Sequence, residues 1–232
     1  MLKIGHRGAS GYEPENTLAS FKKAMRLKFD MVEFDVQMCK TGELVIIHDD
    51  KVNRTTNGKG LVREKTFKEL RSLDAGKGQK IPTFKEVLNL VQGKCQANIE
   101  LKTKGVAEAV AKELIKLFKA GVNPATWLVS SFHFKELVKF REYLLKTNPV
   151  LAGKIKIGIL FMKVPKSYLK LCRQINAYSI NPDLKKIKRK LINEAQQNGL
   201  KVFVFTVNTE KDIARMKEWG VDGIFSNFPD KI

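Results

Sequence analysis

Short apolar segments alternate with amphipathic segments along nearly the whole 232-residue chain. Strands joined by helical connections pair in parallel and are covered by those helices, so the alternation predicts an α/β fold rather than a β-sandwich. Nine strands are predicted, over residues 4–7, 31–36, 44–48, 97–101, 127–131, 155–161, 177–180, 202–207 and 223–225. Helices are predicted over 16–28, 83–91, 106–120, 134–146, 165–175, 185–198 and 210–219. The length suffices for one barrel of eight strands.

An eight-stranded barrel leaves one of the nine predicted strands outside it, and we assign that place to the strand at 44–48. Its connection to the strand at 31–36 is too short for a helical crossover, and Thr41-Gly42 within that connection indicates a hairpin turn. The hairpin would return His48 to the rim where the strand at 31–36 ends. We therefore predict a single domain over 1–232, a TIM-type (β/α)8 barrel with a small inserted subdomain at about 37–82, after the second barrel strand.

Carboxylates occur at strand positions that suit a cation. Glu33 and Asp35 are two residues apart, so in an extended strand both side chains lie on one face, where they repel each other unless a cation or a base lies between them. Glu100 lies in a second apolar strand and is followed by Lys102, with which it could also form a simple ion pair. Three carboxylates without a cysteine ligand favour Mg²⁺ or Ca²⁺ over zinc.

Two of the three histidines, His6 and His48, lie in turns that follow short apolar strands. Imidazole titrates near neutral pH, so the pair could supply a general base and a general acid, although the sequence leaves open which begins in which role. Arg7 and Lys102 would then face an anion. The third histidine, His133, is expected at a helix start or on the surface.

These residues occur within a set of short motifs that follow one another along the chain. The motifs are His6-Arg7-Gly8, Pro14-Glu15-Asn16-Thr17, Glu33-Phe34-Asp35-Val36, His48-Asp49, Arg54-Thr55-Thr56-Asn57-Gly58, Ile81-Pro82-Thr83, Glu100-Leu101-Lys102, Ser130-Ser131-Phe132, Thr206-Val207-Asn208 and Gly223-Ile224. In their order and spacing the chain resembles the glycerophosphodiester phosphodiesterase family. The resemblance implies a TIM-type barrel, a divalent cation and two histidines that hydrolyse a glycerophosphodiester to glycerol 3-phosphate and an alcohol.

The resemblance also implies roles for individual residues. His6 and His48 would be catalytic, and Glu33, Asp35 and Glu100 would hold the Mg²⁺ or Ca²⁺ ion. Arg7, Lys102, Phe132 and Glu15 would contact the substrate or its phosphate. Glu15 has an equal alternative as a first-turn helix charge, with Asn16 as the helix cap. The nucleophile could be the 2-hydroxyl of the substrate's glycerol, which gives a cyclic phosphate, or water.

One position departs from the family pattern. Residue 205 is Phe, where members of the family commonly carry Trp before Thr-Val-Asn, so an indole N–H is missing near the rim. The preference for the alcohol half of the substrate could differ as a result. A core position is the expectation for Phe205 itself.

The net charge of +19 fits a lysine-rich, solvated surface, and the run at 185–190 is expected to begin an amphipathic helix. The charge also leaves two alternatives open. One is a lysophospholipase D or phospholipase C-like lipid enzyme in weak contact with an anionic surface, and the other is a non-catalytic basic binding protein. The partner expected from the family resemblance is a small-molecule glycerophosphodiester substrate, and no nucleic-acid partner is expected.

Cellular context follows from cysteine and hydropathy patterns. The three cysteines are far apart and lack CxxC spacing, which favours reduced thiols over a disulfide framework or a zinc site. No apolar run approaches the roughly 20 residues that span a bilayer. The first motif begins at His6, which leaves no room for a signal peptide before it, so we expect a cytoplasmic protein. The sequence gives no indication of the oligomeric state.

Overall fold

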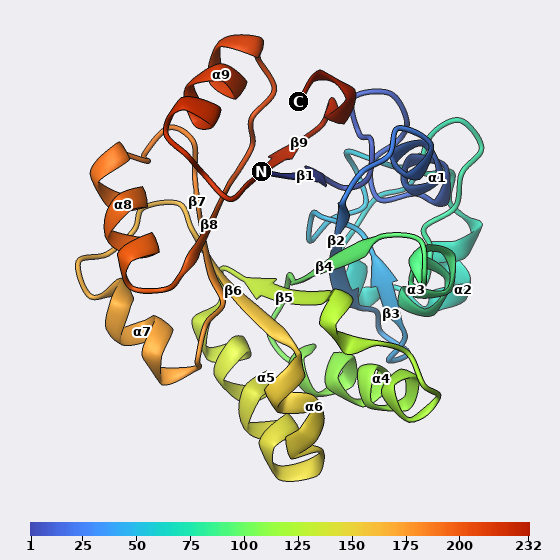
Figure 1. Cartoon of the computed structure of the whole chain (residues 1–232). Coiled ribbons are helices and arrows are strands. Elements are labelled where there is room, and N and C mark those ends of the chain that lie inside the picture. The colour runs from blue at the N-terminus through green and yellow to red at the C-terminus, as the bar shows by residue number, and fades with distance from the viewer.

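Eight parallel strands close into a barrel in the computed structural model, which describes residues 1–232. The barrel strands are β1 (Leu2–Gly5), β2 (Met31–Met38), β4 (Gln96–Leu101), β5 (Trp127–Ser131), β6 (Lys156–Phe161), β7 (Ser179–Pro182), β8 (Lys201–Val204) and β9 (Gly223–Ser226). They pair in the order β1-β9-β8-β7-β6-β5-β4-β2, and the pairing of β1 with β2 closes the ring. Figure 1 shows the helices arranged around this ring. The predicted TIM-type (β/α)8 barrel is confirmed.

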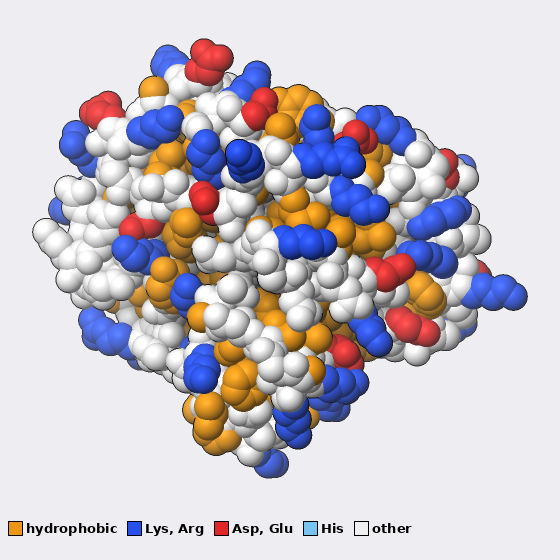
Figure 2. All heavy atoms as spheres, turned by 45° about the vertical axis from the view of Figure 1, so that its right-hand side comes forward, with side chains coloured by type: hydrophobic (Ala, Val, Ile, Leu, Met, Phe, Trp, Pro, Cys, Tyr) orange, Lys and Arg blue, Asp and Glu red, His pale blue; other side chains and the backbone are white.

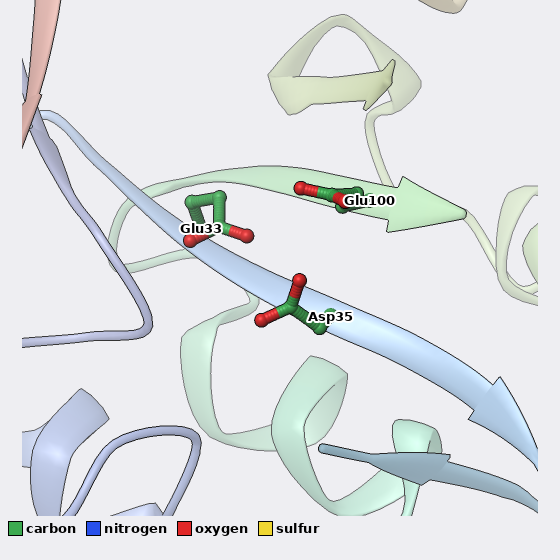
Figure 3. A group of neighbouring side chains, drawn as sticks. All are labelled: Glu33, Asp35 and Glu100. Carbon is green, nitrogen blue, oxygen red and sulfur yellow. The ribbon is translucent and has the colours of Figure 1, made fainter. Parts of the chain in front are cut away.

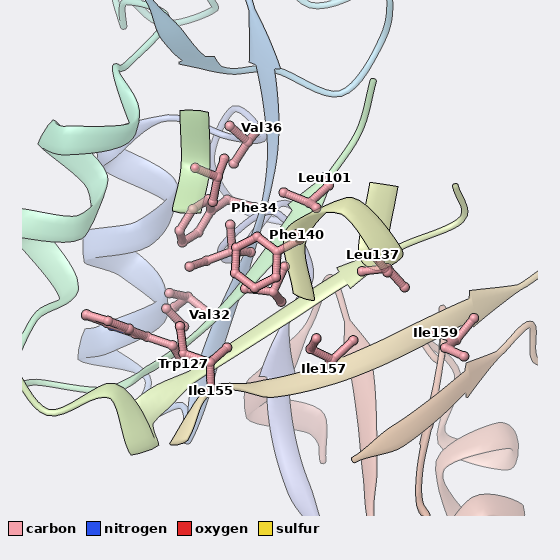
Figure 4. Packing of buried hydrophobic residues seen from close by; sticks show 14 of the residues in the cluster. Val32, Phe34, Val36, Leu101, Trp127, Leu137, Phe140, Ile155, Ile157 and Ile159 are labelled. Carbon is pink, nitrogen blue, oxygen red and sulfur yellow. The ribbon is translucent and has the colours of Figure 1, made fainter. Parts of the chain in front are cut away.

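The outer layer consists mainly of the helices that connect consecutive barrel strands. They are α1 (Leu18–Arg26), α3 (Phe84–Val91), α4 (Ala107–Lys119), α5 (Phe134–Thr147), α6 (Pro149–Lys154), α7 (Tyr168–Gln174), α8 (Arg189–Gln197) and α9 (Glu210–Glu218). Short 3₁₀ segments are η2 (Pro124–Thr126) and η3 (Pro229–Lys231). The main hydrophobic core lies between strands and helices, where Phe34 and Val36 of β2 lie in one cluster with Leu137 and Phe140 of α5 (Figure 4). No helix is both long and apolar enough to cross a membrane.

Alternation along the barrel strands separates this core from the barrel interior. Phe34 of β2 belongs to the outer core, while its neighbours Glu33 and Asp35 belong to the opposite face, as the two-residue period of a strand requires. A separate apolar cluster inside the barrel contains Ile4, Met31, Leu128, Phe203 and Phe225. Polar side chains occur further along the same strands, toward their carboxyl ends.

The antiparallel strand β3 (Leu44–Ile46) pairs with β2 outside the barrel ring. Val36 of β2 is opposite Ile46, so the predicted hairpin is present and returns the chain to the end of β2. Residues 47–82 continue with η1 (Val62–Glu64) and α2 (Phe67–Ser72) before α3 begins. The hairpin and this segment together have their own buried cluster, formed by Cys39, Val45, Ile47, Val52, Val62, Leu70, Ala75 and Ile81.

Several predicted boundaries were wrong, and local hydrogen bonds explain two of them. α8 begins at Arg189 rather than at residue 185, because the Asp183 carboxylate accepts the Lys185 backbone N–H and holds a turn there. α1 begins at Leu18, capped by the Thr17 hydroxyl, so Asn16 is not the cap. α7 begins at Tyr168 rather than at 165, β3 ends at Ile46 rather than at 48, and β8 ends at Val204 rather than at 207.

Candidate active site

Three buried carboxylates meet at the carboxyl ends of β2 and β4. The strand register places Asp35 directly opposite Glu100, and Glu33 lies two residues before Asp35 on the same face. One oxygen from each of the three lies within 4.8 Å of the others, and the residues are only 1–7% exposed. Figure 3 shows the three side chains turned toward one another. The carboxylate cluster expected from the sequence is therefore assembled by two neighbouring strands.

The turn after β1 approaches this cluster through its backbone. The Arg7 N–H donates a hydrogen bond of 2.8 Å to Glu33 Oε2, and Arg7 adopts φ = 55° to do so. Gly8 follows with φ = 81°, and a Cβ there would lie 2.5 Å from Ser20 Oγ, so only glycine fits. Ser20 Oγ in turn donates to the Arg7 carbonyl oxygen, which locks the turn onto α1.

Both predicted catalytic histidines are held through Nδ1. His6 Nδ1 lies 2.7 Å from Asn227 Oδ1, and His48 Nδ1 lies 2.6 Å from Asp49 Oδ1. Because each partner atom is an oxygen acceptor, each Nδ1 carries the proton, which leaves Nε2 as the basic atom of the neutral ring. Burial, together with the nearby Arg7 charge, lowers the pKa of His6 to about 4, and burial also lowers the pKa of His48.

The loop that carries His48 is anchored by Gln37, a buried residue of β2. The Gln37 amide Nε2 donates to the carbonyl oxygens of Ile47, His48 and Asp49, at 3.0, 3.0 and 2.8 Å. A strand residue thus fixes three consecutive carbonyls of the loop. Since β2 also carries Glu33 and Asp35, the position of His48 is tied to the carboxylates.

A chain of ion pairs links the two histidine-bearing turns through Arg54. Its guanidinium makes two hydrogen bonds to Glu15 (2.7 and 2.8 Å) and two to Asp49 (2.7 and 2.9 Å). Glu15 also accepts a 2.8 Å hydrogen bond from Arg7 Nη1, and Asp49 accepts from His48. Hydrogen bonds from Arg54 hold the pKa of Asp49 well below its usual range. Arg54 therefore joins the carboxylate that orients Arg7 to the carboxylate that orients His48.

The charges inside the carboxylate cluster are unevenly balanced. Lys102 Nζ lies 2.9 Å from Glu100 Oε1 and 3.5 Å from Asp35 Oδ1, while Arg7 Nε lies 3.5 Å from Asp35 Oδ2. Burial would raise the pKa of Asp35, but Lys102 and Arg7 lower it below its ordinary value. Burial and the Asp35 charge raise the pKa of Glu100 to about 7 and that of Glu33 well above its usual value. The three carboxylates together therefore carry more negative charge than Arg7 and Lys102 neutralise.

A divalent cation fits this cluster on two observations. Asp35 Oδ1 is buried and has no hydrogen-bond partner, so a strong acceptor is left free among the three carboxylates. The donors are all carboxylate oxygens, which suit a hard cation such as Mg²⁺ or Ca²⁺. A bound cation would also remove the repulsion that raises the pKa values of Glu33 and Glu100.

A cavity of about 550 Å³ opens above the cluster. His6, Arg7, His48 and Lys102 line one part of it, with Glu33 and Glu100. Phe132, Phe205, Leu160, Met162 and Phe225 form an apolar wall on the other part. The Phe132 ring packs edge-on against Phe205, with ring centroids 5.5 Å apart, and Lys102 Nζ lies 5.6 Å from the Phe132 ring centroid.

The structure places the other sequence-predicted residues as follows. Phe205 is half-buried: it packs against the apolar cluster inside the barrel, as expected for a core position, and it also lines the cavity. Glu15 does not line the cavity but pairs with Arg7 and Arg54. His133 is exposed at the N-terminus of α5, as predicted.

Several residues that support the site were not predicted to act there, and Asn16 was expected only as a helix cap. Asn16 donates from Nδ2 to Asp35 Oδ2 at 2.8 Å, and its backbone adopts φ = 58°. Asn16, Asp49 and Arg54 lie in the quoted motifs, so the motifs themselves were the available signal. Gln37 and Asn227 lie outside those motifs and act through contacts that only the fold creates.

The fold and the site together define a (β/α)8-barrel hydrolase with an acidic, cation-suited centre flanked by two histidines. Residues 6–231 match the model of the glycerophosphoryl diester phosphodiesterase family. The chain is 38% identical over 242 residues to a glycerophosphodiester phosphodiesterase of Caldanaerobacter subterraneus, covering 100% of this chain and 96% of the relative. A glycerophosphodiester phosphodiesterase of Bacillus altitudinis is 38% identical over 251 residues, with 100% and 96% covered.

A solved structure of a phosphodiesterase from Oleispira antarctica, in complex with its product sn-glycerol-3-phosphate, superposes with a TM-score of 0.87. That protein is 30% identical, and the match covers 99% of this chain and 94% of the other. The chain belongs to the glycerophosphoryl diester phosphodiesterase family and is an enzyme of the phosphoric diester hydrolase class.

Proposed function

We propose that the protein hydrolyses glycerophosphodiesters to glycerol 3-phosphate and an alcohol, with a divalent cation held by Glu33, Asp35 and Glu100. The observation that carries the proposal is the buried carboxylate cluster, two of whose members, Glu33 and Glu100, line the same cavity as two histidines anchored through Nδ1. The expected activity agrees with the names of the relatives and with the product bound to the Oleispira antarctica structure.

The cation, Mg²⁺ or Ca²⁺, supplies Lewis-acid stabilisation of the charge on the phosphate oxygens when it is bound. Arg7 and Lys102 line the cavity beside the cluster and provide two positive charges for the same phosphate. Their ion pairs with Glu15, Asp35 and Glu100 keep both side chains in place before substrate arrives. This prior ordering lowers the entropy that substrate binding would otherwise cost.

His6 and His48 provide the proton transfers. One neutral imidazole accepts the proton of the nucleophilic hydroxyl or water at Nε2, and the other, charged, donates a proton to the oxygen of the leaving alcohol. Asn227 and Asp49 hold the two rings by Nδ1, so both Nε2 atoms remain available for these transfers. The apolar wall with Phe132 and Phe205 limits water around one half of the diester.

The experiment that tests this function is release of glycerol 3-phosphate from glycerophosphocholine and glycerophosphoethanolamine by the purified protein. Release is expected with Mg²⁺ or Ca²⁺, and His6→Ala and His48→Ala should each lose about 100-fold or more in kcat. His133→Ala is the matched control, because this exposed histidine lies outside the main cavity. No release from either substrate with either cation would overturn the proposal.

A second candidate function is a lysophospholipase D, which removes the headgroup from a lysophospholipid. The observation that favours it is the apolar rim of the cavity, where Met162 is 59% exposed and Phe132 is 36% exposed. Such a rim could hold an acyl chain while surface lysines make weak contact with anionic lipid. Faster turnover of lysophosphatidylcholine in vesicles than of glycerophosphocholine would favour this function, and equal or slower turnover would exclude it.

A further inference from the structure

A second cavity, of about 430 Å³, lies next to the candidate active site and shares Lys102 with it. Its lining comes from three parts of the chain: the insertion, the β4–α4 loop and the start of α5. The nine lining residues are Gln37, Met38, Asp50, Leu61, Arg63, Lys102, Thr103, Lys104 and His133. Lys102 lines both cavities, with its ammonium held against Glu100, so the cavities are neighbours and a ligand bound beside the carboxylate cluster can extend toward the second one.

The second cavity is electropositive. Arg63 and Lys104 contribute two positive charges, against one negative charge from Asp50, while the charge of Lys102 is paired with Glu100 and Asp35. Cations that line one cavity raise the local concentration of anions, and a bound anion lowers the repulsion between them.

Arg63 is distinguished from the other arginines of the insertion by its lack of a carboxylate partner. Arg54 and Arg71 each make paired hydrogen bonds to carboxylates, with Glu15 and Asp49 for the first and Glu86 for the second. Arg63 and Lys104 form no ion pair within 4 Å, and both are exposed. Their charges are therefore free to meet a ligand.

Resting on the proposed function, we infer that the second cavity binds an anionic group on the alcohol half of the substrate. The scissile phosphate takes its place between the carboxylate-bound cation and Lys102, and an alcohol that carries a second phosphate reaches Arg63 and Lys104. The favoured substrate class is thus a glycerophosphodiester whose alcohol bears a further phosphate. Hydrolysis remains the same reaction: the glycerol 2-hydroxyl or water attacks the scissile phosphorus, the bond to the alcohol oxygen breaks, and that oxygen takes up a proton. If the 2-hydroxyl attacks, water then opens the cyclic phosphate to glycerol 3-phosphate.

Two substrates isolate this second phosphate. Glycerophosphoglycerol has an uncharged alcohol half, while in bis(glycerophospho)glycerol the same central glycerol carries a second phosphodiester. Initial release of glycerol 3-phosphate gives kcat/KM for each, and the ratio of the two values reports the contribution of the second phosphate. Bis(glycerophospho)glycerol has two equivalent scissile bonds, but this statistical factor is the same for every variant and cancels.

The test compares the double variant Arg63→Ala/Lys104→Ala with the control Arg26→Ala/Lys68→Ala. The control removes the same two charges from exposed positions on α1 and α2 that lie outside both cavities. We expect the kcat/KM ratio to fall about fivefold or more in the first variant, as two partly exposed ion pairs would give, and to keep its wild-type value in the control.

An unchanged ratio in both variants would show that the second cavity does not recognise the anion. An equal fall in both would assign the preference to the overall charge of the protein, and it would overturn the inference as well. Failure of the wild-type protein to release glycerol 3-phosphate from either substrate would instead reject the proposed function itself.

Discussion

At the scale of single residues, the charges that surround the reacting phosphate are arranged in connected pairs rather than singly. Arg54 makes hydrogen bonds to Glu15 and Asp49, and these carboxylates orient Arg7 and His48. A group of this kind contacts no substrate, and its effect passes through the residues it positions. Two side chains that are 41 positions apart in the sequence, Arg7 and His48, therefore share one support.

Replacement of Arg54 should therefore impair turnover. Arg54→Ala frees Glu15 and Asp49, so kcat is expected to fall about tenfold. Arg54→Lys should recover only part of the lost kcat, because an ammonium cannot make paired hydrogen bonds to both carboxylates. The control is Arg71→Ala, which removes a comparable paired interaction with Glu86 elsewhere in the insertion. Equal losses of kcat in Arg54→Ala and Arg71→Ala at matched folded fractions would assign Arg54 a purely structural role.

Glu100 gives a prediction about pH. Its pKa is raised to about 7, chiefly by burial and then by Asp35, so in the cation-free protein it is neutral below that pH and charged above it. The folded state thus holds a proton that the unfolded state releases near pH 4.5, and Glu100 costs stability progressively as pH rises from about 4.5 to 7.

Glu100→Gln keeps the shape of the neutral form and removes this cost. With chelator present, the free energy of unfolding of the variant should exceed that of the wild type by an amount that grows between pH 5 and pH 8, up to about 3 kcal/mol. Its Tm should be higher over the same pH range. With Mg²⁺ or Ca²⁺ added, the wild type should gain stability and the variant should gain less. Thermal melts at several pH values measure both effects. A stability difference between variant and wild type that does not change with pH would contradict the raised pKa of the buried Glu100 carboxyl.

At the scale of elements, the insertion between β2 and α3 supplies His48, a residue that no barrel strand carries. β3 pairs with β2, and Gln37 fixes the carbonyls of residues 47–49, so His48 is placed by the hairpin and not by a barrel strand. The cluster that includes Leu70 and Val52 gives the segment its own core. We propose that residues 37–82 behave as a subdomain whose local stability sets the position of His48.

Leu70→Ala tests this proposal. Leu70 is fully buried in the insertion's cluster, so the substitution should remove about 3 kcal/mol of local stability and lower activity through His48 and Arg54. Hydrogen exchange should accelerate within the insertion while the strands β5 to β8 keep their protection. Leu145→Ala, at a position on α5 that is 54% exposed, is the control. Acceleration throughout the barrel would show that the insertion does not unfold separately.

The strands, helices and connections also show how much of the fold and of the site could be predicted from the sequence. Strand alternation and the short 38–43 connection were sufficient for the barrel and for the hairpin, because periodicity and loop length are local properties. The carboxylate cluster was predictable from the i, i+2 spacing of Glu33 and Asp35. The start of α8 and the roles of Gln37 and Asn227 were not, because each depends on contacts between segments that only the folded chain brings together.

At the scale of the whole molecule, a charge of +19 surrounds a site that is itself built around carboxylates. Figure 2 shows lysine and arginine side chains distributed over one face, between hydrophobic and acidic groups, rather than gathered in one patch. A distributed positive field attracts anionic small molecules from all directions. The acidic cluster, buried beneath Arg7 and Lys102, is screened from the approaching phosphate by these two cations.

We propose that hydrolysis depends on one divalent cation held by Glu33, Asp35 and Glu100. The most direct measurement is release of glycerol 3-phosphate from glycerophosphocholine by chelator-stripped protein, as Mg²⁺ or Ca²⁺ is added back while bound cation is counted by equilibrium dialysis. We expect activity to rise in step with one tightly bound cation per chain, and we expect Asp35→Asn to abolish both the binding and the activity. Full activity in the stripped protein, or cation binding that survives in Asp35→Asn, would contradict this proposal.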